Sequence, residues 1–121
     1  MNTHDVAHAF TAMMKEGRFE EAGEQFWDVG VVSIEAMGMP GMDPITAGLE
    51  ALKAKGEWWF TNNEIHAITT EGPFINGDQF AVRFDMDVTS KATGTRTQGA
   101  EIGLYTVKDG KIVEERFFYA M

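Results

Sequence analysis

Residues 79–90 read QFAVRFDMDVTS, and the pattern of this segment indicates the fold class of the chain. Apolar side chains alternate with polar ones along it, with one face carrying Phe80, Val82, Phe84, Met86 and Val88. A period of two is typical of a strand that has one face on a core and the other toward solvent. The Asn76-Gly77 turn before it and the strand-like residues 96–107 and 111–120 after it predict an antiparallel meander.

The first half of the chain has a helical period instead. Apolar residues recur every three to four positions over residues 6–14 and again over residues 19–27, which predicts two short helices. Gly17 between them suits the end of the first helix, because glycine tolerates a positive φ. Residues 31–36, VVSIEA, are rich in β-branched side chains and predict one short strand.

A long third helix is expected next. Asp43 and Pro44 suit its N-cap and first helical position, and the helix is predicted to end at Asn62 or Asn63. Residues 64–75 then predict the first strand of the meander. The expected fold is therefore α+β, with the element order α-α-β-α-β-β-β-β.

Length and composition fit one globular domain over residues 1–121. Hydrophobic residues make up 44% of the chain and charged residues 24%, which argues against disorder. The lack of cysteine excludes a disulfide scaffold, a thiolate nucleophile and cysteine-ligated metal sites. A net charge of −9 disfavours nucleic acid and anionic membranes as partners. Neither a signal peptide nor a run of about 20 apolar residues is visible, so a cytoplasmic location is expected.

Three segments carry a resemblance to a known family. They are KEGRFEE at residues 15–21, GLEAL at residues 48–52 and YTVKDGKIVEE at residues 105–115. The second is similar to the family pattern G-x-E-A-I, and the third to F-R-F-R-D-G-K-I-V-E-E. With them the chain resembles the NTF2-like (cystatin-like) superfamily, and within it the SnoaL-like and ketosteroid-isomerase-like proteins. The resemblance implies a cone in which a curved antiparallel sheet wraps around three N-terminal helices, with a pocket in its mouth.

The resemblance also permits a test for ketosteroid isomerase activity. Those enzymes hold a developing oxyanion with a tyrosine and an aspartic acid, and a second aspartate moves the proton. In this chain Phe10 falls at the tyrosine position, Gly103 at the acid position and Ala36 at the base position. Glu35, beside Ala36, is expected to point the opposite way. Phenylalanine, glycine and alanine cannot do this chemistry, so ketosteroid isomerase activity is not expected.

The closing hairpin is predicted to place two acids on one face of the sheet. A three-residue loop at residues 108–110 pairs Gly103 with Glu115. If Gly103 points inward, as the resemblance implies, Glu101, Tyr105 and Glu115 share the concave face, and Gly103 leaves space for a substrate atom. Glu115 and Glu101 are then candidates for general acid or base, and Tyr105 for a hydrogen-bond donor. The alternatives are a solvated strand position for Glu115 and a salt bridge for Glu101.

Further candidates for ligand contact line the implied pocket. They are Phe10, Met14, Trp27, Ala36, Trp58, Phe84, Met86, Gly103, Phe117 and Tyr119. At helical spacing the tryptophans equally suit a plain core, where Trp59 continues the apolar stripe of the long helix and Trp58 lies about 100° around it. No cofactor and no metal is expected, since His4 and His8 have no acidic ligand with a clear position beside them.

These observations leave three functions open. The favoured one is a cofactor-free enzyme of the cyclase, isomerase or dehydratase class that moves protons on a small hydrophobic molecule. The alternatives are a carrier that binds such a molecule without chemistry, and a dimeric assembly domain with a filled cavity. A homodimer is expected because the outer sheet face carries an apolar patch rimmed by charge. The apolar members of this patch are Ala81, Ala100, Ile102, Leu104 and Phe118.

Overall fold

The computed structural model describes residues 1–38 and 43–120. Within these residues the chain forms three helices and six strands. The helices are α1 (Thr3–Lys15), α2 (Phe19–Phe26) and α3 (Leu49–Asn62). The strands are β1 (Trp27–Ile34), β2 (Ile45–Ala47), β3 (Asn63–Asn76), β4 (Gln79–Ser90), β5 (Arg96–Lys108) and β6 (Lys111–Phe118). In this described part of the chain, no helix combines the length and the apolar character needed to cross a membrane.

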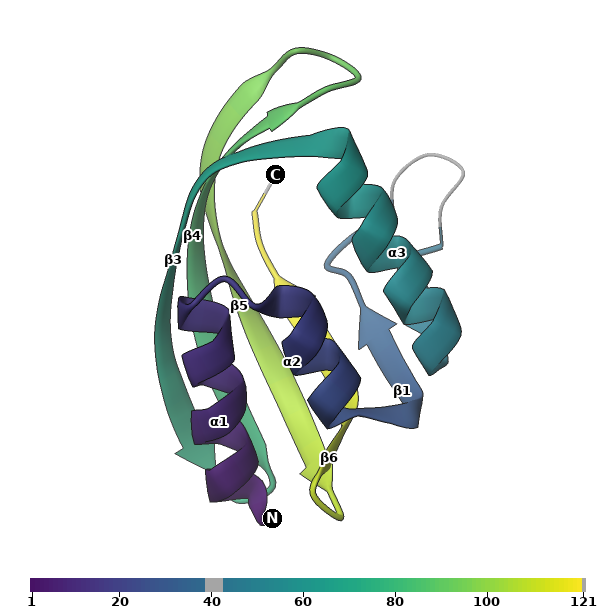
Figure 1. Ribbon diagram of the computed structural model, residues 1–121, viewed down its shortest axis with the longest axis vertical. Coiled ribbons are helices and arrows are strands. Elements are labelled where there is room, and N and C mark those ends of the chain that lie inside the picture. The colour runs from purple at the N-terminus through teal and green to yellow at the C-terminus, as the bar shows by residue number, and fades with distance from the viewer. Residues whose placement is uncertain (39–42, 121) are drawn as a thin grey trace.

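One sheet, with the strand order β2-β1-β6-β5-β4-β3, forms the wall of the structure. Neighbouring strands pair antiparallel, except that β1 and β6 are parallel. The sheet curves around α1 and α2, and α3 packs beside β1 (Figure 1). The expected α+β cone is confirmed, and the structure adds β2 as a further strand and a parallel join between β1 and the meander.

The core lies between α1 and the concave face of the meander. Phe10 is fully buried there, with its ring centroid 4.9 Å from that of Tyr105 and 5.9 Å from that of Phe80. Phe26 of α2 packs edge-on against Phe10 at 6.2 Å. Buried aromatic rings remove large apolar areas from water, so this cluster is a main source of stability.

The third helix begins later than the sequence predicts. Asp43 does not cap it, because its Oδ1 accepts a hydrogen bond from the Ile45 amide at 2.9 Å and so closes a turn. Residues Ile45–Ala47 then form β2, which pairs with β1. The helix starts after Gly48, whose φ of 95° favours glycine. Its predicted end is confirmed, with Asn62 as the last helical residue.

The first strand begins earlier than predicted and ends earlier. Trp27, expected at the end of the second helix, is the first residue of β1. Ile34 ends the strand, and Ala36 lies exposed beyond it. The parallel pairing with β6 places Ser33 directly beside Glu115, which no local pattern in the sequence announces.

The closing hairpin keeps the predicted inward face but changes the pairing. Its turn has two residues, Asp109 and Gly110, with φ values of 52° and 77°, one residue fewer than predicted. That change alone would move the inward-facing side chains of the following strand to the outer face, because strand side chains alternate between faces. A β-bulge at Val113 adds one residue and restores the face. Glu115 therefore lies opposite Tyr105, two positions from its predicted partner.

Candidate functional site

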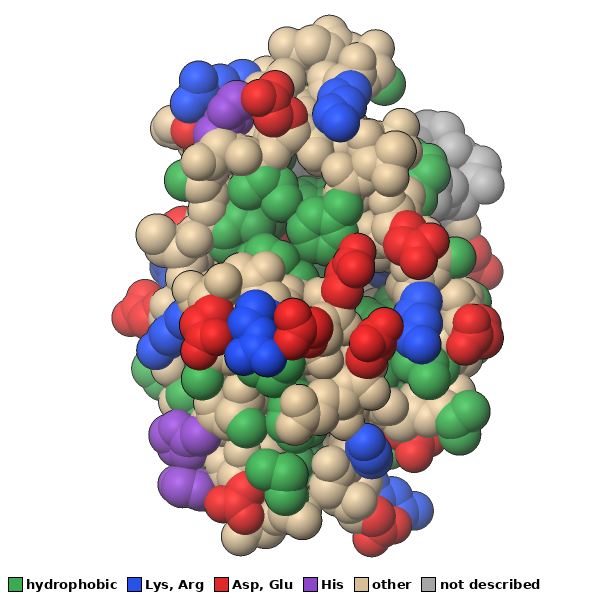
Figure 2. All heavy atoms as spheres, viewed as in Figure 1, with side chains coloured by type: hydrophobic (Ala, Val, Ile, Leu, Met, Phe, Trp, Pro, Cys, Tyr) green, Lys and Arg blue, Asp and Glu red, His purple; other side chains and the backbone are tan. Residues whose placement is uncertain are grey.

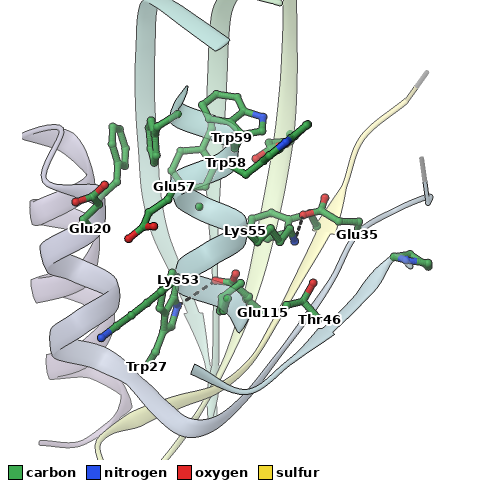
Figure 3. Close-up of a pocket in the computed structure, with 18 of the residues that line it drawn as sticks. Glu20, Trp27, Glu35, Thr46, Lys53, Lys55, Glu57, Trp58, Trp59 and Glu115 are labelled. Atoms are coloured by element: carbon green, nitrogen blue, oxygen red, sulfur yellow. Dashed lines mark hydrogen bonds and ion pairs between the residues drawn. The ribbon is translucent and has the colours of Figure 1, made fainter. Parts of the chain in front are cut away.

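A pocket of about 430 Å³ opens between α3 and the concave face of the sheet, and every described helix and strand contributes to its lining. A volume of this size falls within the range of about 300–1,000 Å³ that is typical of small-molecule sites. On the face drawn in Figure 2, hydrophobic side chains lie exposed above α1 and α2, with acidic side chains next to them. The labelled side chains in Figure 3 come from α2, α3, β2, β6 and the β1 region.

Glu115 is a buried acid of this pocket, with 4% of its surface exposed. Its Oε1 accepts a hydrogen bond from Ser33 Oγ at 2.9 Å. Its Oε2 accepts one from Trp27 Nε1 at 3.2 Å (Figure 3). Burial raises the pKa of Glu115 to about 7, although both hydrogen bonds and the charge of Lys55 act in the opposite direction. A carboxyl group with this pKa can exchange its proton near neutral pH.

Glu101 is the second acid, on β5 and on the same concave face. Burial, followed by the negative charges of Glu35 and Glu115, raises the pKa of Glu101 to about 7, while the charge of Lys55 lowers it. In the described part of the chain no hydrogen bond to its carboxyl group is found. Two acids of the pocket, Glu101 and Glu115, therefore each have a pKa of about 7.

Lys55 is the cation that the acids share. From α3 its Nζ donates to Glu35 Oε1 at 2.5 Å (Figure 3). The same Nζ donates to Ser33 Oγ at 3.3 Å. Glu35 also accepts a hydrogen bond from Tyr119 Oη at 3.1 Å. A chain of hydrogen bonds thus runs from Tyr119 through Glu35, Lys55 and Ser33 to Glu115. Over residues 1–38 and 43–120, no group of three or more histidines and acids is arranged to hold a metal ion.

Tyr105 brings a hydroxyl group to the pocket. Its ring is buried and stacks on Phe80 at a centroid distance of 4.9 Å. The ring lies over Gly103, where Oη is 2.8 Å from the position a Cβ would take. Burial, and then the charges of Glu115, Glu101 and Glu35, keep the pKa of Tyr105 well above its usual value, so the hydroxyl remains a donor. No hydrogen bond from it to another described residue is found, which leaves it available to a ligand.

The structure brings most of the predicted site residues to this pocket. Its lining includes Glu101, Tyr105, Glu115, Met14, Trp27, Trp58, Phe84, Met86, Phe117 and Tyr119. Three predicted ligand contacts do not line it. Phe10 belongs to the core, Ala36 is exposed beyond β1, and Gly103 is covered by the Tyr105 ring. The space expected above Gly103 for a substrate atom is therefore filled by a side chain of the protein.

The polar residues around the acids were not predicted from the sequence. Glu35, expected to point away, lies in the pocket and pairs with Lys55, and Ser33 holds Glu115. The signal was the period of two in β1, because Val31 and Ser33 share its buried face and Glu35 follows in phase. Lys55 follows Leu52, the buried residue of α3, by three positions, which places it on the same helix face.

Comparison with known proteins gives the family context. The SnoaL-like domain family matches residues 1–119. A candidate SnoaL-like polyketide cyclase of Mesorhizobium loti, whose name also carries the words carbohydrate phosphatase, is 48% identical, with a TM-score of 0.94 over 98% of this chain and 100% of that one. No curated protein matches the chain.

Two more distant solved structures share the fold. A candidate isomerase of Bacillus subtilis is 21% identical, with a TM-score of 0.78 over 99% of this chain and 90% of that one. A protein of unknown function with a cystatin-like fold, from Xanthomonas campestris, is 20% identical, with a TM-score of 0.79 over 100% of this chain and 92% of that one. At these identities the likeness concerns the fold alone.

Proposed function

The chain belongs to the SnoaL-like domain family, and from this premise we propose that it is a cofactor-free enzyme that transfers protons on a small hydrophobic molecule. One observation carries the proposal: Glu101 and Glu115, each with a pKa of about 7, lie together in a pocket rich in aromatic side chains. A pKa close to the working pH makes a group efficient both as a base and as an acid. Strongly shifted pKa values are common at functional sites, which supports a catalytic role for these acids over a purely structural one.

The acid pair supplies a base and an acid at the same time. With a pKa of about 7 each, the two acids are both about half ionised at neutral pH, so together they hold about one proton. The ionised member takes a proton from the carbon next to a ligand carbonyl, the C–H electron pair forms the enolate double bond, and the carbonyl oxygen gains the negative charge. Tyr105 Oη donates a hydrogen bond to that oxygen. The protonated member then returns a proton to the product.

A cyclisation is the reaction we favour, in line with the polyketide cyclase name of the similar Mesorhizobium loti protein. In that step the enolate carbon attacks a second carbonyl carbon of the same molecule, and the new alkoxide takes the proton held by the acid pair. The aromatic walls of Trp58, Phe84 and Phe117 suit a planar ligand. Seven carboxyl groups against two lysines in the lining disfavour a phosphate ester as the substrate.

Deuterium exchange into 2-tetralone tests the proposal without the natural substrate. This neutral bicyclic ketone has acidic C–H bonds next to its carbonyl, and proton NMR follows their exchange in D₂O. We expect the protein to accelerate exchange near neutral pH, and Glu101→Gln and Glu115→Gln to return the rate toward that of buffer. Glu57→Gln is the matched control, because Glu57 lines the pocket but is exposed, and it should keep the acceleration.

Ligand binding separates the enzyme from the alternatives. Displacement of the neutral fluorescent probe N-phenyl-1-naphthylamine by 2-tetralone reports occupancy of the pocket. Displacement without accelerated exchange contradicts the enzyme and supports a carrier. A protein that binds neither compound would contradict both pocket functions and would favour an assembly domain.

We also propose that the protein is a homodimer through the outer face of its sheet. Ile102 and Phe118 pair on this face and are 43% and 50% exposed. Phe74, 58% exposed, extends the patch, because Ala81 connects it across the sheet to Leu104. Apolar side chains with this exposure in one patch are typical of an interface. A two-fold dimer would cover the patch with its own copy.

A further inference from the structure

Gly23 lies in the middle of α2 and faces the indole ring of Trp27. A Cβ on Gly23 would lie 2.6, 2.7 and 2.8 Å from Cζ3, Cε3 and Cη2 of that ring. Ordinary van der Waals contact at such a position begins at 3.4 Å. Any side chain at residue 23 would therefore force the ring to move.

The backbone gives no reason for glycine at this position. Gly23 is an interior residue of α2 and lacks the positive φ that Gly17 and Gly48 have. Inside a helix, glycine is less favourable than alanine because it loses more conformational freedom on folding. The remaining physical reason for glycine at position 23 is that the Trp27 ring occupies the space where a Cβ would lie.

The ring that rests on Gly23 has its polar atom on the pocket acid. The three close atoms form the edge of the indole away from Nε1, and Nε1 donates to Glu115 Oε2 at 3.2 Å (Figure 3). This distance is at the long end of the usual range, so a small displacement of the ring breaks the bond. Glu115 would then keep its hydrogen bond from Ser33, which reaches the other carboxylate oxygen.

We propose that Gly23 is a positioning residue of the pocket: its missing side chain fixes the Trp27 indole in the orientation that binds Glu115. The other groups that act on this carboxyl group are Ser33, Lys55 and Glu35, none of which residue 23 adjoins in the chain. The inference rests on the proposed function, in which Glu115 transfers protons, but its test measures the carboxyl group itself.

The test is the pKa of Glu115 in the variant Gly23→Ala, measured by carbon-detected NMR of the glutamate side chains. Loss of the indole bond removes an interaction that favours the ionised form, so we expect this pKa to rise by about one unit. Trp27→Phe keeps a ring but removes the N–H, and should raise the pKa by a similar amount. The double variant should raise it no further, because both changes remove the same bond.

Gly56→Ala is the matched control. Gly56 is also a helical glycine, in α3, and no atom lies within 4 Å of its Cβ position, so the pKa of Glu115 should stay unchanged. An unchanged pKa in Gly23→Ala, or additive shifts in the double variant, would overturn the proposal.

Folding of the variants is itself informative. If Gly23→Ala does not fold, the double variant Gly23→Ala with Trp27→Phe tests the proposal in its place, because the smaller ring leaves room for the methyl group. A folded double variant with the Glu115 pKa of Trp27→Phe supports the proposal, and a double variant that also fails to fold overturns it. These measurements do not use 2-tetralone, so a failed exchange assay would refute the proposed enzyme and leave the positioning role of Gly23 standing.

Discussion

The Tyr105 hydroxyl lies across Gly103, with Oη 2.8 Å from the position that a Cβ of residue 103 would take. Gly99, on the same strand, has open space around its Cβ position. We therefore expect Gly103→Ala to lower the free energy of unfolding by about 1–3 kcal/mol, the usual cost of overpacking, and Gly99→Ala to change it by about 0.5 kcal/mol at most. Urea unfolding measures both variants. Equal losses would mean that the Tyr105 ring does not occupy this place.

Stability should fall with rising pH because Glu115 folds with a raised pKa, about 7 against its ordinary 4.5. Between these values the folded state binds more protons than the unfolded state. The contribution of Glu115 to the free energy of unfolding should therefore decrease by about 3 kcal/mol from about pH 4.5 to about pH 7 and then level off, and Glu101, with the same shift, should add to the decrease. Urea unfolding across this range measures the slope.

Two variants identify the group behind this pH dependence. Glu115→Gln cannot ionise, so it should reduce the slope. Glu114→Gln, on the opposite face of β6, should leave the slope as it is in the unmodified protein. A stability that does not change with pH in the unmodified protein would contradict a protonated, buried Glu115.

Lys55 lowers the pKa of both pocket acids through its positive charge. Lys55→Met keeps much of the side-chain length but removes this charge, so the pKa values of Glu101 and Glu115 should both rise above 7. Lys53→Met is the control, because Lys53 lines the pocket but is not among the groups that shift either acid. The glutamate NMR titration reports both values. A fall in either pKa would show that Lys55 does not face the acid pair in solution.

Substitutions of the two tryptophans of α3 should lower stability to different extents. Both should weaken ligand binding, since both side chains line the pocket. Trp59 is half-buried, with its ring edge-on to Phe60 at 5.3 Å, whereas Trp58 is 45% exposed. Trp59→Ala should lower the free energy of unfolding by about 2–3 kcal/mol, less than a fully buried tryptophan would, and Trp58→Ala by about 1 kcal/mol at most. Both should weaken binding of N-phenyl-1-naphthylamine. Equal losses of stability would contradict the orientation of α3.

Light scattering at micromolar concentration should give twice the mass of one chain, because a dimer covers the apolar patch on the outer face. Leu104→Asp and Phe118→Asp place a charge within that patch and should yield monomers. Val29→Asp is the control, since Val29 is a large exposed apolar residue of β1 outside the patch. A monomeric mass for the unmodified protein would contradict the dimer.

Local periodicity was enough to predict most elements and the inward face of the meander. The alternation in residues 79–90 predicts β4, and the concave face does hold Glu101, Tyr105 and Glu115. For Glu115 two differences from the predicted hairpin cancel each other. The turn is one residue shorter than predicted, and the β-bulge at Val113 adds one residue, which returns Glu115 to the inward face. The predicted face was therefore correct although the predicted pairing was not.

Long-range packing was beyond what these local patterns encode. The alternation of β1 indicates which of its side chains are buried, but not that β6 is its parallel neighbour, so Ser33 could not be placed beside Glu115. The expected space above Gly103 was wrong for a related reason. A missing side chain leaves a volume, and here Tyr105, two residues further along the same strand, fills it.

Because β1 pairs in parallel with β6, the acid site forms only after two segments that are far apart in the sequence have come together. The hydrogen bonds that Ser33 and Trp27 donate to Glu115 span 82 and 88 residues of chain. Closing so long a loop costs chain entropy that the hairpins of the meander do not require. During synthesis on a ribosome, at about 5–20 residues per second, both donors leave the exit tunnel several seconds before their acceptor has been made. During that period Ser33 and Trp27 cannot donate to Glu115, so a nascent chain presents both donors to water and to other partners.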